Sequence, residues 1–193
     1  MAVNTEKVFV GIPDRVTGAV MSAPRGSVLP TDSSEAPDAA FIDSGYITED
    51  GCTLSDSQSW TDIKDWGGDT VRRIKSSSDV TVATSFLEVN EASAKAAFGE
   101  NNVTITPGTA LTGEEIAIKI NVNEPERKSW IINMLDGERH MRIVIPDGQI
   151  TDRGDMTFTR QGAVVMPVTI AASPDANGDA VLLYANDGVL VGP

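Results

Sequence analysis

The stretch Val80-Thr-Val-Ala-Thr-Ser-Phe-Leu-Glu-Val-Asn-Glu-Ala-Ser-Ala-Lys-Ala-Ala-Phe-Gly99 decides the fold of this chain. In its first seven residues, larger apolar side chains alternate with small or polar ones, the period-2 pattern of a half-buried strand. Asn90 suits the N-cap of a helix over residues 91–98, and Gly99 suits the end of that helix in the left-handed αL conformation. The stretch therefore predicts one strand followed by one short helix.

An unusual polar segment, Thr53-Leu-Ser-Asp-Ser-Gln-Ser59, lies upstream. It looks extended, yet it has no apolar face that could hold it on a core. Trp60, Ile63 and Trp66 follow at three-residue spacing. Two interpretations are open. The segment is either a solvated loop, or part of a hairpin over residues 53–75 that another copy of the protein stabilises through its tryptophans.

Downstream of Gly99 the chain is a succession of predicted strands joined by turns. Asp136-Gly137 and Asn177-Gly178 are hairpin signals. Alternation places strands near residues 103–105, 116–122, 130–134, 141–145, 156–158, 164–170 and 181–185. One helix is too few for the crossovers of a parallel sheet. We therefore expect a mainly β protein, an antiparallel β-sandwich or partly closed barrel with one short flanking helix.

Residues 1–44 differ in character from the rest. The run Val8-Phe-Val10 can pair as a short strand, but four prolines follow, and proline confines strands to sheet edges. We expect an N-terminal arm with extended loops over residues 1–44, and a single β-sandwich domain over residues 45–193.

Charge narrows the possible functions. The chain of 193 residues has a net charge of −13, and between Asp32 and Asp69 ten acidic residues stand against one base, Lys64. Nucleic-acid affinity comes mainly from lysine and arginine, so sequence-specific binding of DNA or RNA is disfavoured. Solubility is the simplest role for most of these acids.

Catalytic and metal-binding signatures are missing. His140 is the only histidine and Cys52 the only cysteine, so neither a thiolate zinc site nor an internal disulfide is expected. No phosphate loop, dinucleotide fingerprint or calcium loop is present, and the Asp-Gly pairs are explained as turns. We expect no catalytic residue, no cofactor and no metal. The first seven residues carry no secretory signal and no apolar run can cross a bilayer, so folding in a cytoplasm is expected.

The order and spacing of several short motifs resemble the tail tube (major tail) proteins of long-tailed bacteriophages, especially those of actinobacteriophages. The resemblance covers roughly residues 8–185. Its landmarks are Ala23-Pro-Arg-Gly26, Leu29-Pro-Thr-Asp32, Gly45-Tyr46, Glu49-Asp-Gly51, Trp66-Gly-Gly68 and Glu88-Val-Asn-Glu91.

The resemblance implies a structural virion protein of a siphovirus, not an enzyme. In such a protein six copies form a ring, and stacked rings form the hollow tube through which phage DNA is delivered without specific binding. Implied partners are the tape measure protein, the tail terminator and the baseplate or distal tail proteins, with assembly in the host cytoplasm and no membrane.

Two sets of site residues follow from this interpretation. A net negative bore would repel DNA phosphates, and the expected wall carboxylates are Asp56, Asp62, Asp79, Asp152 and Asp155. Buried aromatic residues dominate interface energies, and the expected assembly residues are Phe9, Trp60, Ile63, Trp66, Arg72 and Arg73.

Other classes remain open at this point. A tail-terminator or neck protein, or the inner tube of a contractile system, would share the sandwich and the ring. A β-sandwich ligand-binding module would show a cluster of exposed aromatic residues, and two of the three tryptophans do lie close in sequence. An enzyme would need a constellation of catalytic residues that the sequence does not contain.

Overall fold

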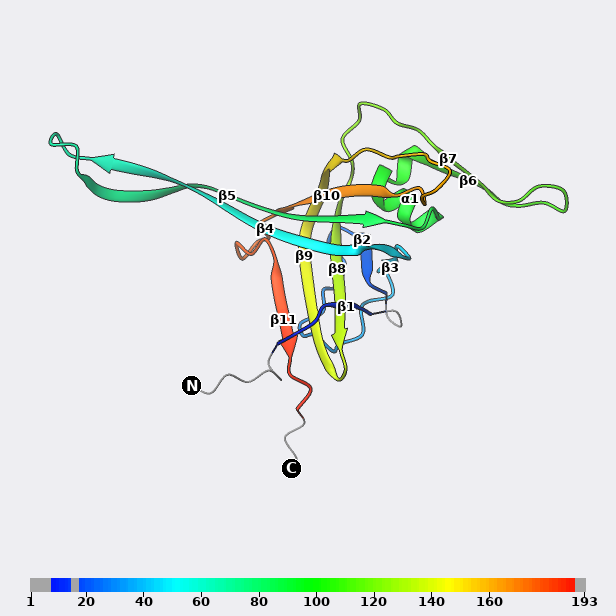
Figure 1. Ribbon diagram of the computed structural model, residues 1–193, viewed down its shortest axis with the longest axis horizontal. Helices are drawn as coiled ribbons and strands as arrows, with labels where there is room; N and C mark the ends of the chain where they lie inside the picture. The colour runs from blue at the N-terminus through cyan, green and yellow to red at the C-terminus, as the bar shows by residue number, and fades with distance from the viewer. Residues whose placement is uncertain (1–7, 15–17, 190–193) are drawn as a thin grey trace.

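The computed structural model describes residues 8–14 and 18–189 (Figure 1). Parts of the expected arm (residues 1–7 and 15–17) and the last four residues lie outside this range. One α-helix, α1 (Glu91–Phe98), and a 3₁₀ turn at Glu100–Asn102 occur in the described part. The strands are β1 (Ile12–Pro13), β2 (Val20–Pro24), β3 (Ile42–Asp43), β4 (Ile47–Lys64), β5 (Thr70–Phe86), β6 (Val103–Thr106), β7 (Glu115–Ile118), β8 (Arg127–Asp136), β9 (Arg139–Arg153), β10 (Met166–Ser173) and β11 (Leu182–Asn186).

The described strands form a nine-stranded antiparallel sheet and a separate β6–β7 pair. The order in the large sheet is β3-β2-β8-β9-β10-β5-β4, with β1 added to β8 and β11 added to β9. The sheet does not close on itself, because β3 and β4 at its two ends do not pair. The prediction of a mainly β, antiparallel fold with one short helix is confirmed.

Strand β9 belongs to two parts of this sheet. Along one edge it pairs with β8, and along the other with β11 over residues 140–144 and then β10 over residues 147–153. The chain bends between these two stretches, so β10, β5 and β4 cross over β8 and β9 (Figure 1). Gly148 lies at the bend, where a Cβ would come within 2.7 Å of Trp130 and 2.8 Å of Ile170. The bend therefore needs a residue without a side chain.

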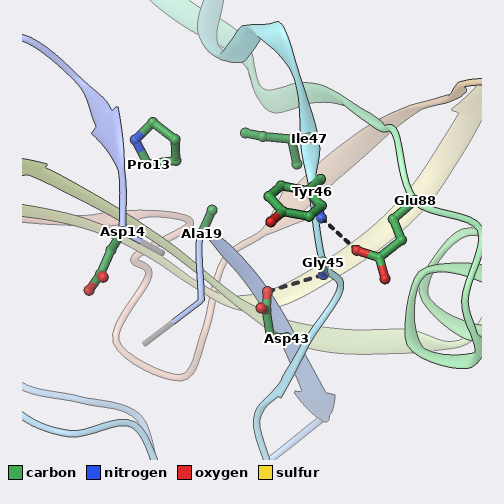
Figure 2. A pocket seen from close by; sticks show the side chains of 8 residues that line it. All are labelled: Pro13, Asp14, Ala19, Asp43, Gly45, Tyr46, Ile47 and Glu88. Atoms are coloured by element: carbon green, nitrogen blue, oxygen red, sulfur yellow. Dashed lines mark hydrogen bonds between the residues drawn. The ribbon is translucent and has the colours of Figure 1, made fainter. Parts of the chain in front are cut away.

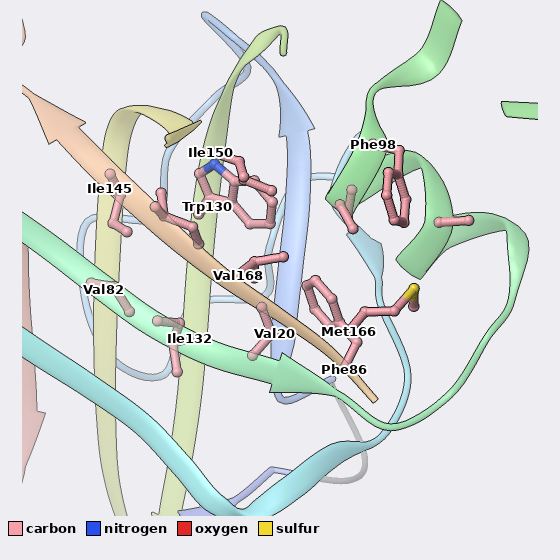
Figure 3. Close-up of a cluster of buried hydrophobic side chains, with 14 of the residues drawn as sticks. Val20, Val82, Phe86, Phe98, Trp130, Ile132, Ile145, Ile150, Met166 and Val168 are labelled. Carbon is pink, nitrogen blue, oxygen red and sulfur yellow. The ribbon is translucent and has the colours of Figure 1, made fainter. Parts of the chain in front are cut away.

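The main core fills the space between the crossing strands and is covered at one end by α1 (Figure 3). Phe86, Trp130 and Ile145 are almost completely buried there. Fully burying one such side chain stabilises the fold by roughly 1.5–3 kcal/mol. The other principal members are Val20, Val82, Ala97, Phe98, Ile132, Ile150, Met166, Val168 and Ile170.

The helix forms over the predicted residues, and Asn90 caps it as predicted. The Asn90 side chain accepts a hydrogen bond from the Ser93 backbone N–H at 2.8 Å, and the Ser93 hydroxyl accepts one from the Asn90 N–H at 3.0 Å. The predicted αL conformation of Gly99 is wrong, because its ψ of 151° accompanies a φ of 90°. This conformation leads the chain directly into the 3₁₀ turn and towards β6.

Four predicted β features differ from the structure. The strand expected over residues 116–122 ends at Ile118, because its partner β6 begins at Val103, directly after the 3₁₀ turn. Residues 156–158 lie in a loop, and Phe158 is 75% exposed. Val8–Val10 forms no strand, and pairing starts at Ile12. At Asn177-Gly178 the chain turns, but β10 and β11 both pair with β9 rather than with each other.

Part of the expected N-terminal arm is integrated into the sheet. Strand β2 lies between β3 and β8, and Val20, Met21 and Ala23 are buried. The buried Arg142 guanidinium holds the following loop by donating hydrogen bonds to the backbone carbonyls of Asp32 at 3.0 Å and Glu35 at 2.6 Å. The division of the chain at residue 44 therefore stays a prediction about assembly.

Candidate assembly interface

The β4–β5 hairpin is the largest surface feature of the molecule. It projects far beyond the core, and its tip is the turn at residues 65–69 (Figure 1). The Asp65 carboxylate fixes the turn by accepting a hydrogen bond from the Asp69 N–H at 2.8 Å. The interpretation of residues 53–59 as a loop is therefore wrong, and the hairpin interpretation is confirmed. Its stabilisation by another copy stays a prediction.

The outer part of the hairpin is a ribbon without a core. Every residue from Thr53 to Asp79 is exposed. Strand β10 supports β5 only over residues 80–86, so beyond Val80 both edges of the ribbon are unpaired among the described residues. An isolated two-stranded hairpin is marginally stable in water. The ribbon therefore has the properties of a surface that another molecule covers.

The strand register gives the ribbon two distinct faces. The first, which we call the core-side face, continues from Cys52 at the edge of the core through Leu54, Asp56, Trp60 and Asp62. The second, the outer face, carries small polar side chains along β4 opposite small or acidic ones on β5. Its cross-strand pairs are Thr53–Ala83, Ser55–Thr81, Ser57–Asp79 and Ser59–Ser77.

The predicted assembly residues gather at the tip, with one exception. Trp66 is fully exposed and Trp60 is 56% exposed. Ile63 lies opposite Arg72 on the outer face. Phe9 does not belong to this group, because its ring lies 6.0 Å from the Arg139 guanidinium at the β8–β9 turn, away from the hairpin tip (Figure 1).

An ion pair joins one of the carboxylates expected at the bore to one of the residues expected at the assembly interface. The Asp62 carboxylate, expected at the bore, accepts a hydrogen bond from Arg73, expected at the assembly interface, at 2.9 Å. With Trp60 these two residues line a surface pocket of about 400 Å³. Asp62 and Arg73 therefore share the core-side face of the tip and cannot serve two opposite surfaces.

The five carboxylates expected at the bore do not share a face. Asp152 pairs with Thr169, which pairs in turn with Ala83, so Asp152 and Asp79 both lie on the outer face of the sheet. Asp56 and Asp62 lie on the core-side face, and Asp155 lies in the loop after β9. Two pairs therefore share a face, Asp79 with Asp152 and Asp56 with Asp62, so the five carboxylates cannot all line one wall, and the bore assignment stays a prediction for one pair at most.

An acidic pocket at the other end of the hairpin was missed by sequence reasoning. We call it the root pocket, because it lies where β4 begins and β5 ends (Figure 2). Its volume is about 300 Å³, and its lining includes Asp14, Asp43, Tyr46, Ile47 and Glu88. These residues are spread over more than 70 positions, and no motif links them. Only the fold brings them together.

The carboxylates of the root pocket are held by backbone contacts. Gly45 donates a hydrogen bond from its N–H to Asp43 at 3.2 Å, and Tyr46 donates one to Glu88 at 3.3 Å (Figure 2). Burial raises the pKa of Asp43, and the negative charges of Glu88 and Asp14 raise it further against the hydrogen bond from Gly45. The pocket therefore gathers negative charge at a partly buried place, where a positively charged group would offset it.

The residues that a reaction centre would need do not meet. His140 lies in β9 opposite Leu135 and Asn186. The Cys52 thiol donates to the Thr84 hydroxyl at 3.3 Å, and burial raises the pKa of this thiol. Within residues 8–14 and 18–189, no group of three or more potential ligands could hold a metal ion. No helix in the same residues is long and apolar enough to span a membrane.

The fold and this surface define a mainly β protein with a long hairpin that is uncovered at its outer end. The sequence matches the family model described as phage tail tube protein over residues 1–190. The chain therefore belongs to the phage tail tube protein family, which confirms the resemblance to tail tube proteins predicted from its motifs, whereas the special likeness to actinobacteriophage proteins stays a prediction. Membership of this family makes it a structural component of the virion, not an enzyme. No curated protein matches the sequence.

Among solved structures, the chain is similar to three components of contractile injection systems. The tube-terminating cap of an anti-feeding prophage shares 11% identity with a TM-score of 0.45, over 96% of this chain and all of that one. The sheath/tube terminator of the extracellular injection system PVC shares 13% identity with a TM-score of 0.45, over 91% and 99% of the two chains. A chain of the PVC sheath-tube complex shares 12% identity with a TM-score of 0.40, over 96% and 100%.

Proposed function

We propose that six copies of this chain join edge to edge into a ring, and that stacked rings form the tail tube through which phage DNA leaves the capsid. The observation that carries the proposal is the uncovered β4–β5 ribbon. Unpaired strands are an aggregation hazard that proteins normally cover, and ring closure would cover them.

The four strands β4, β5, β10 and β9 suit such a ring. In the described residues β4 has an unpaired outer edge, and β9 is free on its far side over residues 150–153, because β8 ends its pairing at Gln149. All neighbours within this group are antiparallel, and the group has an even number of strands. Strand β4 of the next copy would therefore meet β9 in the antiparallel direction, and the pattern could repeat around a closed ring.

The outer face of these four strands, as far as Ser59 on β4 and Ser77 on β5, is the proposed wall of the bore, and the tip of the hairpin beyond these residues is not part of it. The wall positions carry no lysine or arginine along residues 53–59, 77–85 and 167–171, and Asp79 and Asp152 make the wall negative. Without lysine or arginine this face offers DNA phosphates no positive charge, and the carboxylates repel phosphates within a screening length of roughly 8 Å. The wall would let DNA pass without holding it.

Family membership supports the remaining parts of the proposal. The tube would be assembled in the host cytoplasm around a tape measure protein and would be closed by a tail terminator at one end. The other end would join baseplate or distal tail proteins. A siphovirus setting agrees with the motifs of the sequence.

The proposal predicts that the purified protein polymerises at high concentration into long hollow fibres. Ring closure provides the partners of both free edges, and stacking extends the rings without limit. Negative-stain microscopy and sedimentation would show fibres with a central channel and sixfold end views. Single rings that never stack would favour a terminator or neck protein, and monomers at every concentration would contradict the proposal.

A further inference from the structure

The two ends of the β4–β5 hairpin differ in charge. We call residues 60–75 the hairpin head. It holds four of the 15 basic residues of the chain and only three of the 28 acidic ones, so its net charge is +1 in a chain of −13. The root pocket at the opposite end of the same two strands contains three carboxylates, and no lysine or arginine is among the described residues that line it.

Arg72 is the basic residue of the head that is best placed to act outside the molecule. Arg73 forms its ion pair with Asp62. Arg72 is exposed and lies on the other face of the ribbon, and within the described residues it forms no ion pair. Exposed Ile63 and Ile74 lie beside it on that face. The outer face of the head therefore presents a guanidinium group next to exposed apolar side chains.

The root pocket matches this combination. Asp43 accepts hydrogen bonds from the backbone N–H groups of Gly45 and Ser44, and Glu88 accepts one from Tyr46. An ionised carboxylate has about four lone-pair sites, so both groups keep sites for a planar guanidinium donor. Tyr46, Ile47 and Pro13 supply apolar surface around the carboxylates (Figure 2). A guanidinium is weakly hydrated and suits such a partly buried acidic site better than an ammonium group.

We propose that Arg72 of one copy binds Asp43 and Glu88 in the root pocket of a copy in the next ring. This inference rests on the proposed function and adds the site that receives the hairpin. Residues 53–64 extend the head by roughly 40 Å at about 3.3 Å per residue, which gives it reach beyond its own core. The hairpin head and the root pocket lie at opposite ends of the same two strands. Each copy can therefore bind one copy in the ring on one side through its head and one in the ring on the other side through its pocket, so the contact repeats along a stack of rings without closing.

The test compares Arg72→Gln with Lys75→Gln in the full chain; Lys75 is an exposed residue of the head on the core-side face, opposite Trp60. Both changes remove one positive charge from the head, but only the first removes the proposed contact. We expect Arg72→Gln to form rings and to need at least a tenfold higher protein concentration for tubes at low salt. Lys75→Gln should remain close to wild type. Sedimentation and negative-stain microscopy measure both the rings and the tubes.

The pocket is tested with Asp43→Asn and Glu88→Gln, which keep an acceptor for the Gly45 and Tyr46 N–H groups. Each should shift tube formation in the same direction as Arg72→Gln. Arg72→Asp with Asp43→Arg in one chain should recover stacking relative to either single change. Normal tubes from Arg72→Gln and from both pocket variants would overturn this inference alone. Failure of the wild-type chain to form rings would overturn the proposed function as well.

Discussion

At the scale of single residues, the fold depends on positions where two chain segments approach closely. Gly148 shows this most clearly, because it lies just after the place where β9 passes from β11 to β10, and Trp130 and Ile170 fill the space next to its Cα. Its φ is not in the left-handed region. A side chain at this position is therefore excluded by packing and not by backbone conformation.

We expect Gly148→Ala to lower the free energy of unfolding by about 1–3 kcal/mol, because overpacking a filled core forces its neighbours to move. Urea denaturation followed by circular dichroism measures the change. Gly113→Ala is the matched control, since no atom lies within 4 Å of the added Cβ and its φ is ordinary. Equal stability of Gly148→Ala and wild type would show that the bend tolerates a side chain.

At the scale of helices and strands, the sequence predicted correctly those features that depend only on residues close together in the chain. The capped helix at residues 91–98 and the inward positions Val82 and Phe86 follow from spacing and capping chemistry alone. The strand expected to reach residue 122 ends earlier, because its length depends on its partner β6. The alternation of apolar and polar residues within a strand does not show where the partner strand begins. The root pocket depends on the meeting of Asp14, Asp43 and Glu88, which no local pattern records.

The hairpin tip yields a prediction about assembly. Trp66 is fully exposed, so Trp66→Ala should change the stability of the free subunit by less than about 0.5 kcal/mol. Aromatic anchors at interfaces typically contribute 2 kcal/mol or more, so tube formation should require a roughly 30-fold higher concentration. Thermal unfolding and sedimentation separate the two effects. Val122→Ala, at another fully exposed apolar residue outside the hairpin, is the control, and normal tubes from Trp66→Ala would reject the anchor role.

At the scale of the whole molecule, the subunit leaves part of its sheet without packing or hydrogen-bonding partners. Its core is buried, whereas the outer part of its longest strand pair has no core and, among the described residues, its sheet has free edges on both β4 and β9. The sequence indicated this imbalance through a polar strand segment with adjacent tryptophans. It could not indicate which carboxylates share a face, because Asp56 and Asp79 belong to opposite faces only through the register of β4 and β5.

If Arg72 binds the root pocket as proposed, stacking should depend on pH. Burial, with the charges of Glu88 and Asp14, raises the pKa of Asp43 in the free subunit, and Tyr46 is the remaining titratable group among the described residues that line the pocket. Binding of Arg72 requires the ionised carboxylate, so lowering the pH through this raised pKa should dissociate the stack. A carboxyl whose pKa is raised on folding favours the folded state as pH falls, so protonation of Asp43 does not itself unfold the subunit. Light scattering should therefore report loss of tubes at a pH where circular dichroism still reports folded protein. Tubes that persist until the subunit unfolds would show that no titrating carboxylate of the root pocket holds the rings together.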